Sequence, residues 1–291
     1  MKHPPHRDSL VVEQALIITH QARAGAQHVL RVQAPDTARR AKAGNFAHLQ
    51  CHPMLPMRRP ISIMCCDAEQ GWVEFLYKVV GEGTRLLSQR QAGDVISMIA
   101  PIGNYFEVPP QAKRPLLIGG GVGMPPMIFM AQQLRRQAQI QPLVILGSEV
   151  PFPFDAAPSR IMVPGIAADV IAAMPLLDDW GVASRLASLQ GYAGVYQGYV
   201  TDLARQYLQS VTDAQRGEVS VFACGPHAML SAVAALAREF SLPCQLSLEE
   251  FMACGVGGCA GCVVPVSLPE GPAMKRVCVD GPVFDARQVF S

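Results

Sequence analysis

Four cysteines near the carboxyl end of the chain have the spacing to hold a metal cluster. Cys254, Cys259 and Cys262 lie within the segment CGVGGCAGC, and Cys278 follows after 15 intervening residues. The order C-x4-C-x2-C…C is the plant-type ferredoxin arrangement for a 2Fe–2S cluster. The glycines between these cysteines let the backbone turn sharply and bring N–H groups near the sulfurs. We therefore predict a 2Fe–2S cluster. Zinc is the alternative, although four-thiolate zinc sites more often use two C-x2-C pairs.

A glycine-rich turn at residues 116–126, LLIGGGVGMPP, has the context of a phosphate-binding site. It follows an expected strand and opens an expected helix, so the N–H groups of Gly119, Gly121 and Gly123 could approach a pyrophosphate. Met124 occupies the third glycine position of the G-x-G-x-x-G pattern. A tight strand–helix turn without a ligand is therefore the alternative.

A second segment, ACGPHAML at residues 223–230, repeats the strand–turn–helix pattern. The carboxyl ends of parallel strands are where such sheets bind ligands. Cys224 is expected at that edge, where it could touch a bound ring and serve as a catalytic residue. The alternative is a buried cysteine that precedes the helix-starting Pro226.

The first half of the chain offers a second candidate site for a phosphate-bearing ligand. In RRPISI, Arg59 supplies a charged donor and Ser62 a hydroxyl group. In LYKVVGEGTRLLS, Gly83 and Thr84 supply N–H groups at an expected helix start. A surface arginine and an ordinary turn are the alternative. His48, His52 and the methionine-rich segment MPPMIFMA are expected to be structural.

Composition limits the classes of partner. The formal net charge of +1 gives no basic field for nucleic acid. No apolar run is long enough to span a bilayer, and MKHPPHRDSL lacks the apolar core of a signal peptide. We expect a cytoplasmic protein, in which nine cysteines favour metal or redox chemistry over disulfides. Only 16% of the residues are charged, against about 25% in typical proteins. This indicates surface hidden against another subunit or a well-buried enzyme core.

The order of expected elements predicts a multi-domain β plus α/β protein. Residues 10–110 contain short strands separated by glycines, which favours an antiparallel barrel or sandwich. From Pro115 onward strands alternate with helices, which favours a parallel α/β sheet. Within this half, residues 167–180 are expected to be helical and 183–189 to form a strand. The last 45 residues are too poor in large apolar groups to fold without a cross-link such as a bound metal. The expected domains are 8–111, 112–243 and 244–291.

Together these segments resemble the ferredoxin–NADP reductase superfamily. More narrowly, the chain resembles the electron-transfer subunits of two-subunit, NAD-linked dihydroorotate dehydrogenases. The matching segments appear in family order: GNFAHL, RRPISI, LYKVVGEGTRLLS, GDVISMIAPIGNYF, IGGGVGMPP, GYVTDL, FACGPHAML, EEFMACGVGGCAGC and VCVDGPVF. Ala100 and Tyr105 depart from the glycines usual in similar sequences, and residues 150–185 match poorly.

The resemblance implies an antiparallel FAD-binding β-barrel, a parallel α/β NAD-binding domain and a C-terminal 2Fe–2S module. It places the flavin against Arg59, Pro60, Ile61, Ser62, Leu76, Tyr77 and Lys78, the FAD phosphate at Gly83 and Thr84, and the cluster on Cys254, Cys259, Cys262 and Cys278. It also implies a partner: an FMN-containing catalytic subunit that oxidises dihydroorotate for pyrimidine biosynthesis, in a heterotetramer of two plus two. Electrons would run from dihydroorotate through FMN, the cluster and FAD to NAD⁺.

Glu149 favours NAD over NADP as the nucleotide. It falls 28 residues after Gly121, at the end of the second strand of the α/β half, where a ribose-binding acid belongs. A carboxylate accepts a hydrogen bond from a 2′-hydroxyl and repels a 2′-phosphate, and the nearest arginine in sequence is Arg160. The alternative is that Glu149 faces solvent.

Two other functions remain compatible with the sequence. Flavin subunits of sulfite reductases, hydrogenases and ferredoxin–NADP transhydrogenases share the same three-part layout with other partners. A non-enzymatic binding module stapled by zinc is an alternative of a different class.

Overall fold

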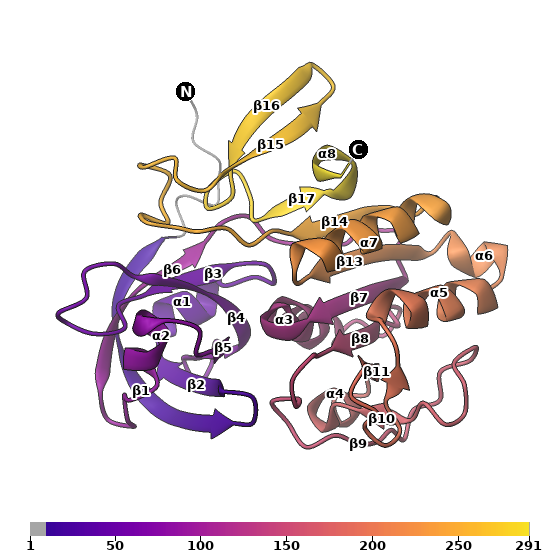
Figure 1. The fold of residues 1–291 in the computed structure, drawn as a ribbon, viewed down its shortest axis with the longest axis horizontal. Coiled ribbons are helices and arrows are strands. Elements are labelled where there is room, and N and C mark those ends of the chain that lie inside the picture. Colours follow the sequence, from indigo (N-terminus) through magenta and orange to yellow (C-terminus); the bar gives the residue numbers. More distant parts are fainter. Residues whose placement is uncertain (1–9, 291) are drawn as a thin grey trace.

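Six antiparallel strands close a barrel in the first third of the chain (Figure 1). The computed structural model describes residues 10–290. The barrel order is β1-β2-β5-β4-β3-β6, with helices α1 and α2 in the connections. These elements are β1 (Val11–Arg23), β2 (Gln27–Gln33), α1 (Pro35–Arg40), β3 (Phe46–Leu49), β4 (Arg59–Asp67), β5 (Trp72–Lys78), α2 (Glu82–Leu87) and β6 (Val95–Ile102). On β1, Ala15 and Ile17 face the core while their neighbours are exposed, which is the period of two that a barrel wall requires.

A seven-stranded sheet forms the second part, in the order β12-β11-β8-β7-β13-β14-β17. All neighbouring pairs are parallel except β14 with β17. The strands are β7 (Arg114–Gly120), β8 (Leu143–Gly147), β11 (Ala183–Ser188), β12 (Tyr196–Gln197), β13 (Val219–Cys224), β14 (Cys244–Ser247) and β17 (Val283–Asp285). The helices of this part are η2 (Gly121–Gly123), α3 (Met124–Leu134), α4 (Pro175–Asp179), α5 (Val200–Ser210), α6 (Asp213–Arg216) and α7 (His227–Glu239). The predicted combination of antiparallel barrel and parallel α/β sheet is confirmed.

The carboxyl-terminal segment lies against both the barrel and the sheet (Figure 1). It contains a hairpin of β15 (Val263–Leu268) and β16 (Gly271–Arg276), then β17 and α8 (Ala286–Val289). After β6, the Asn104 side chain donates to the Val283 carbonyl at 2.8 Å and accepts from the Val283 N–H at 2.8 Å. A Cβ on Gly103 would lie 2.4 Å from Pro282 Cδ. The turn after β6 therefore holds the C-terminal segment to the barrel.

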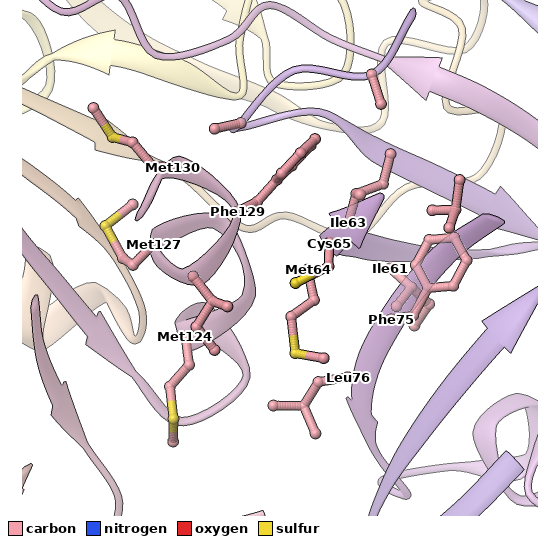
Figure 2. Close-up of a cluster of buried hydrophobic side chains, with 14 of the residues drawn as sticks. Ile61, Ile63, Met64, Cys65, Phe75, Leu76, Met124, Met127, Phe129 and Met130 are labelled. Atoms are coloured by element: carbon pink, nitrogen blue, oxygen red, sulfur yellow. The ribbon is translucent and has the colours of Figure 1, made fainter. Parts of the chain in front are cut away.

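Helix α3 joins the barrel to the sheet through apolar side chains on both sides. It packs against β7, β8 and β13 of the sheet and against β4 of the barrel. Figure 2 shows Met124, Met127, Phe129 and Met130 of α3 on one side of this seam, with Met64 of β4 on the other. All five side chains are buried. The expectation that the methionine-rich segment is structural is confirmed.

The expected helix at residues 167–180 is wrong. Only α4 is helical there, and Ala172–Ala173 form the short strand β10, paired with β9 (Ala157–Pro158). Pro175 explains the difference, because proline has no N–H for a helix interior and is suited to the first helical turn, where the structure places it. The strand expected at 183–189 is present as β11. Within residues 10–290, no helix is long and apolar enough to cross a membrane.

Gly123 lies where the glycine-rich turn touches the next strand of the sheet. A Cβ at this position would lie 2.3 Å from the carbonyl oxygen of Cys224 and 2.5 Å from the nitrogen of Gly225. Both are backbone atoms, which cannot swing aside as a side chain can. Glycine is therefore required at residue 123 by the close approach of two turns at the carboxyl edge of the sheet.

We expect Gly123→Ala to lower the free energy of unfolding by about 1–3 kcal/mol, the usual cost of overpacking. Gly217→Ala is the matched control, because a Cβ there meets nothing closer than 3.4 Å and φ is not positive. Urea denaturation of the purified variants measures the difference. Equal midpoints for the two variants would contradict the close approach.

Candidate functional site

A cavity of about 1330 Å³ lies between the barrel and the carboxyl edge of the sheet. It exceeds the roughly 300–1,000 Å³ of a typical single-ligand pocket, which suits two adjacent ligands. Among the residues singled out from the sequence, its walls include Arg59, Pro60, Ile61, Ser62, Leu76, Tyr77, Lys78, Thr84, Gly121 and Glu149. Gly83, Gly119, Gly123 and Cys224 lie behind this surface rather than on it. The structure thus brings residues from both predicted ligand sites to one cavity.

On the barrel side, Arg59 lies over the first turn of α2. Its Nη1 donates to the Met57 carbonyl at 2.8 Å, and a Cβ on Gly83 would lie 2.5 Å from its Nε. The Thr84 hydroxyl is engaged within the turn, where it accepts from the Val80 N–H and donates to the Gly81 carbonyl. The first N–H groups of a helix have no partner inside it. The Arg59 guanidinium and the N–H groups at the start of α2 therefore lie together, and this arrangement suits a phosphate.

Tyr77 is fixed by a histidine that the sequence did not single out. His20 Nε2 lies 2.8 Å from the Tyr77 hydroxyl, and His20 Nδ1 lies 2.7 Å from the Arg90 carbonyl. Because a carbonyl only accepts, Nδ1 carries the proton and Nε2 accepts from the tyrosine. The His28 ring stacks on Tyr77 with a centroid distance of 5.3 Å. Burial raises the pKa of Tyr77 and lowers that of His20, so this group of rings is neutral at pH 7.

On the sheet side, Glu149 follows β8 and lines the cavity. Within the described part of the chain, the cations on the cavity wall are Arg59 and Lys78, and both belong to the barrel. Gln190 donates to the backbone carbonyl of Glu149 at 3.3 Å, which holds the two loops together. Cys224 ends β13 and is 0% exposed. Burial raises its pKa, so it is a neutral thiol, and its predicted contact with a bound ring stays a prediction.

The four cysteines form two pairs. Cys262 Sγ lies 3.3 Å from Cys278 Sγ. Cys254 Sγ accepts N–H groups from Gly258 at 3.2 Å and from Cys259 at 3.4 Å, which places Cys259 beside it. In residues 10–290, no three side chains of the metal-binding types converge on one point. Two pairs of sulfurs suit two irons, each bound by one pair, and the N–H groups aimed at sulfur are typical of such sites.

The two pairs differ in exposure and in charge. Cys259 is exposed and Cys254 partly so, while Cys262 and Cys278 are buried. Burial opposes ionisation at Cys254, but N–H groups of Val256, Cys259 and Gly258 outweigh it and lower its pKa to about 7. Burial and the adjacent Cys262 raise the pKa of Cys278 to about 12. Cys254 is therefore partly ionised near pH 7, whereas the Cys278 thiol must lose its proton when it binds a metal.

The segment 247–252 connects the cavity to the cysteine loop, a place that the sequence did not predict. It lines the cavity and leads directly into Cys254. The Glu249 side chain is exposed to the cavity, but protein atoms surround it on its other sides. The resulting loss of solvation raises the pKa of its carboxyl group. Phe251 is 93% exposed. The available signal was the unusual sequence LEEF, two acids and an aromatic residue directly before the cysteine motif.

His48 also lies at this junction. It is buried in β3, and a Cβ on Gly255 would lie 2.8 Å from its Nδ1. Burial, with Arg58 and Arg59 nearby, lowers the pKa of His48 to about 4. The ring is therefore neutral and in contact with the cysteine loop.

Comparisons with known proteins agree with this geometry. Residues 249–290 match the family model for the iron-sulfur cluster binding domain of dihydroorotate dehydrogenase B. The electron transfer subunit of dihydroorotate dehydrogenase B (NAD(+)) from Desulforamulus reducens is 31% identical over 266 residues, covering 90% of this chain and 92% of the relative. The corresponding subunit from Bacillus caldolyticus is 36% identical over 256 residues, covering 84% and 86%.

A solved structure shows the same architecture over nearly the whole chain. The NADH-dependent reduced ferredoxin-NADP oxidoreductase, described for flavin-based electron bifurcation, superposes with a TM-score of 0.74 at 26% identity. The match covers 95% of this chain and 90% of that one. The barrel, the sheet and the cavity between them thus define a reductase of the ferredoxin–NADP reductase class, with a flavin site, a nicotinamide nucleotide site and an iron–sulfur module. Within this class, the chain belongs to the family of electron transfer subunits of dihydroorotate dehydrogenase B.

Arg59→Ala should release FAD and leave the iron content unchanged. Loss of a charge-assisted hydrogen bond costs about 1.5–3 kcal/mol, which corresponds to roughly ten- to hundredfold weaker FAD binding. Arg85→Ala is the matched control, because Arg85 is one residue from Thr84 but is exposed and paired with Glu82. Flavin fluorescence on dilution measures release. Wild-type FAD affinity in Arg59→Ala would place the flavin phosphate elsewhere.

Proposed function

We propose that this chain carries electrons between an NAD site, an FAD site and a 2Fe–2S site for an NAD-linked dihydroorotate dehydrogenase of pyrimidine biosynthesis, in the cytoplasm. The observation that supports it most directly is the continuity of the cavity with the cysteine loop through residues 247–252. FAD, when bound, links the two-electron exchange of a nicotinamide to the one-electron exchange of an iron–sulfur cluster. The chain must then hold the nicotinamide against the flavin, and the flavin close to the cluster.

The residues on the cavity wall suit this division of tasks. Arg59, with the N–H groups of Gly83 and Thr84, would hold the flavin phosphate. Tyr77, oriented by His20, would support the flavin on the barrel side. Gly121 and Glu149 would hold the nucleotide at the carboxyl edge of the sheet.

The cluster would be bound by Cys254 with Cys259 and by Cys262 with Cys278. The exposure of Cys259 puts one side of this site near the protein surface, as exchange of electrons with a partner requires. Apolar side chains are exposed around it: Phe251, Val256, Val263 and Met274. Such residues, in a chain with 16% charged residues, support docking of a second subunit. We propose that this subunit is the FMN-containing catalytic subunit, in a heterotetramer of two plus two.

A second candidate is the same electron carrier in a ferredoxin–NADP transhydrogenase complex. The TM-score of 0.74 to the NADH-dependent reduced ferredoxin-NADP oxidoreductase favours considering it. The partner distinguishes the two. Affinity purification from the native host, without oxygen, should recover an FMN-containing subunit, and the complex should reduce NAD⁺ with dihydroorotate.

The same preparation should contain about one FAD and two irons per chain. Stoichiometric zinc with no iron would overturn the cluster. A complex that holds FAD and iron but reduces NAD⁺ only with reduced ferredoxin would replace the first candidate with the second.

Glu149 predicts a preference for NADH over NADPH. With an artificial electron acceptor, kcat/KM should be higher for NADH, and Glu149→Gln should reduce that preference by about tenfold or more through loss of a charged hydrogen bond and of repulsion of the 2′-phosphate. Glu239→Gln is a control, because Glu239 pairs with Arg205 at the C-terminal end of α7, whereas the cavity is lined by residues at the start of that helix. A wild-type preference for NADPH would contradict the assignment. An unchanged ratio in Glu149→Gln would show that another residue sets the preference.

A further inference from the structure

His48 lies on the strand that joins the flavin side of the cavity to the cysteine loop. On β3 it is paired with Pro60 of β4, and two residues earlier Phe46 is paired with Ser62. Pro60, Ser62 and Phe46 all line the cavity. Residues two apart on a strand share a face, so the His48 ring extends from the same face of the barrel wall that borders the cavity.

The His48 ring is buried without a hydrogen-bond partner. It is 1% exposed, and within residues 10–290 neither Nδ1 nor Nε2 has a partner. The backbone of Cys254 and that of Met252 lie close enough to the ring to offset part of the lowering of its pKa, but no contact there has the geometry of a full hydrogen bond. An unsatisfied buried polar group costs about 1–3 kcal/mol. Such a group in a native structure requires an explanation, and a group bound beside it that accepts a hydrogen bond is one.

The cysteine loop is shaped to lie on this ring. Gly255 has a φ of +67°, in the left-handed region that favours glycine. A Cβ there would lie 2.8 Å from His48 Nδ1 and 3.2 Å from its Cε1. Glycine at residue 255 therefore permits both the turn and the contact, and it brings the free ring nitrogens to the residue that follows Cys254.

We propose that His48 is a positioning residue for the iron–sulfur cluster, which donates its ring N–H to a sulfur at the Cys254 side of the cluster and raises the reduction potential. A neutral imidazole has one N–H to donate. Hydrogen bonds to sulfur favour the reduced cluster, which carries one more negative charge, and they are a main determinant of its potential. The proposal rests on the cluster assignment of the proposed function.

The test compares two variants of the full chain loaded with FAD and iron. His48→Phe keeps an aromatic ring but has no donor, whereas His48→Gln keeps an N–H. EPR-monitored redox titration should show the equilibrium constant for cluster reduction lowered about tenfold in His48→Phe, which is about 59 mV for a one-electron couple. His48→Gln should recover part of this shift. His52→Phe is the matched control, because His52 is only partly buried and accepts from the Met54 N–H; its potential should equal that of the wild type.

A spectroscopic measurement tests the contact itself. With ¹⁵N-labelled histidine, pulsed EPR of the reduced cluster should show a histidine nitrogen coupling in the wild type and in His52→Phe, and none in His48→Gln. Wild-type potential in His48→Phe with two irons retained would overturn the proposal, as would a coupling that persists in His48→Gln. If His48→Phe binds no iron, His48→Gln provides the test: a reduction potential equal to that of the wild type, or a histidine coupling that persists, would overturn the proposal. A wild-type protein without iron would overturn the cluster assignment as well, which separates the two failures.

Discussion

The packing of α3 between the barrel and the sheet is the constraint on which the site depends. Met124, Met127, Phe129 and Met130 are buried in a helix that contacts strands on both sides. Full burial of each such side chain contributes roughly 1.5–3 kcal/mol, so this seam resists separation of the two parts. The cavity walls come from both parts, and a fixed seam keeps a flavin on the barrel side at a constant distance from a nucleotide on the sheet side.

A second set of contacts fixes the iron–sulfur segment relative to this cavity. Strand β17 adds to the edge of the sheet by pairing with β14. Asn104 exchanges hydrogen bonds with Val283 from the barrel side, and the Leu248 N–H donates to the Pro282 carbonyl at 2.9 Å. The cysteine loop is therefore held at both ends, and His48 of β3, which pairs with Pro60 of β4, contacts it at Gly255. Electron transfer needs this fixed proximity more than it needs any reactive side chain.

The features that the sequence predicted are those encoded over a few residues. The cysteine spacing, the glycine turn before α3 and the strand–helix alternation all depend on local periodicity and turn chemistry. The helix expected at 167–180 is absent for two reasons. Ala172–Ala173 pair with a strand about fifteen residues earlier. Pro175 begins a separate short helix, α4. The contact of His48 with the cysteine loop and the place of Glu249 on the cavity wall could not be predicted, because both depend on contacts between segments about two hundred residues apart in the sequence.

Reduction of the isolated chain by NADH is the most direct test of electron transfer between the nucleotide, flavin and cluster sites, because all three must then exchange electrons within one chain. The purified protein is titrated with NADH without oxygen and followed by optical and EPR spectroscopy. We expect loss of the oxidised flavin absorption together with the EPR signal of a reduced 2Fe–2S cluster. A flavin that NADH reduces while the cluster responds only to a strong chemical reductant would contradict it.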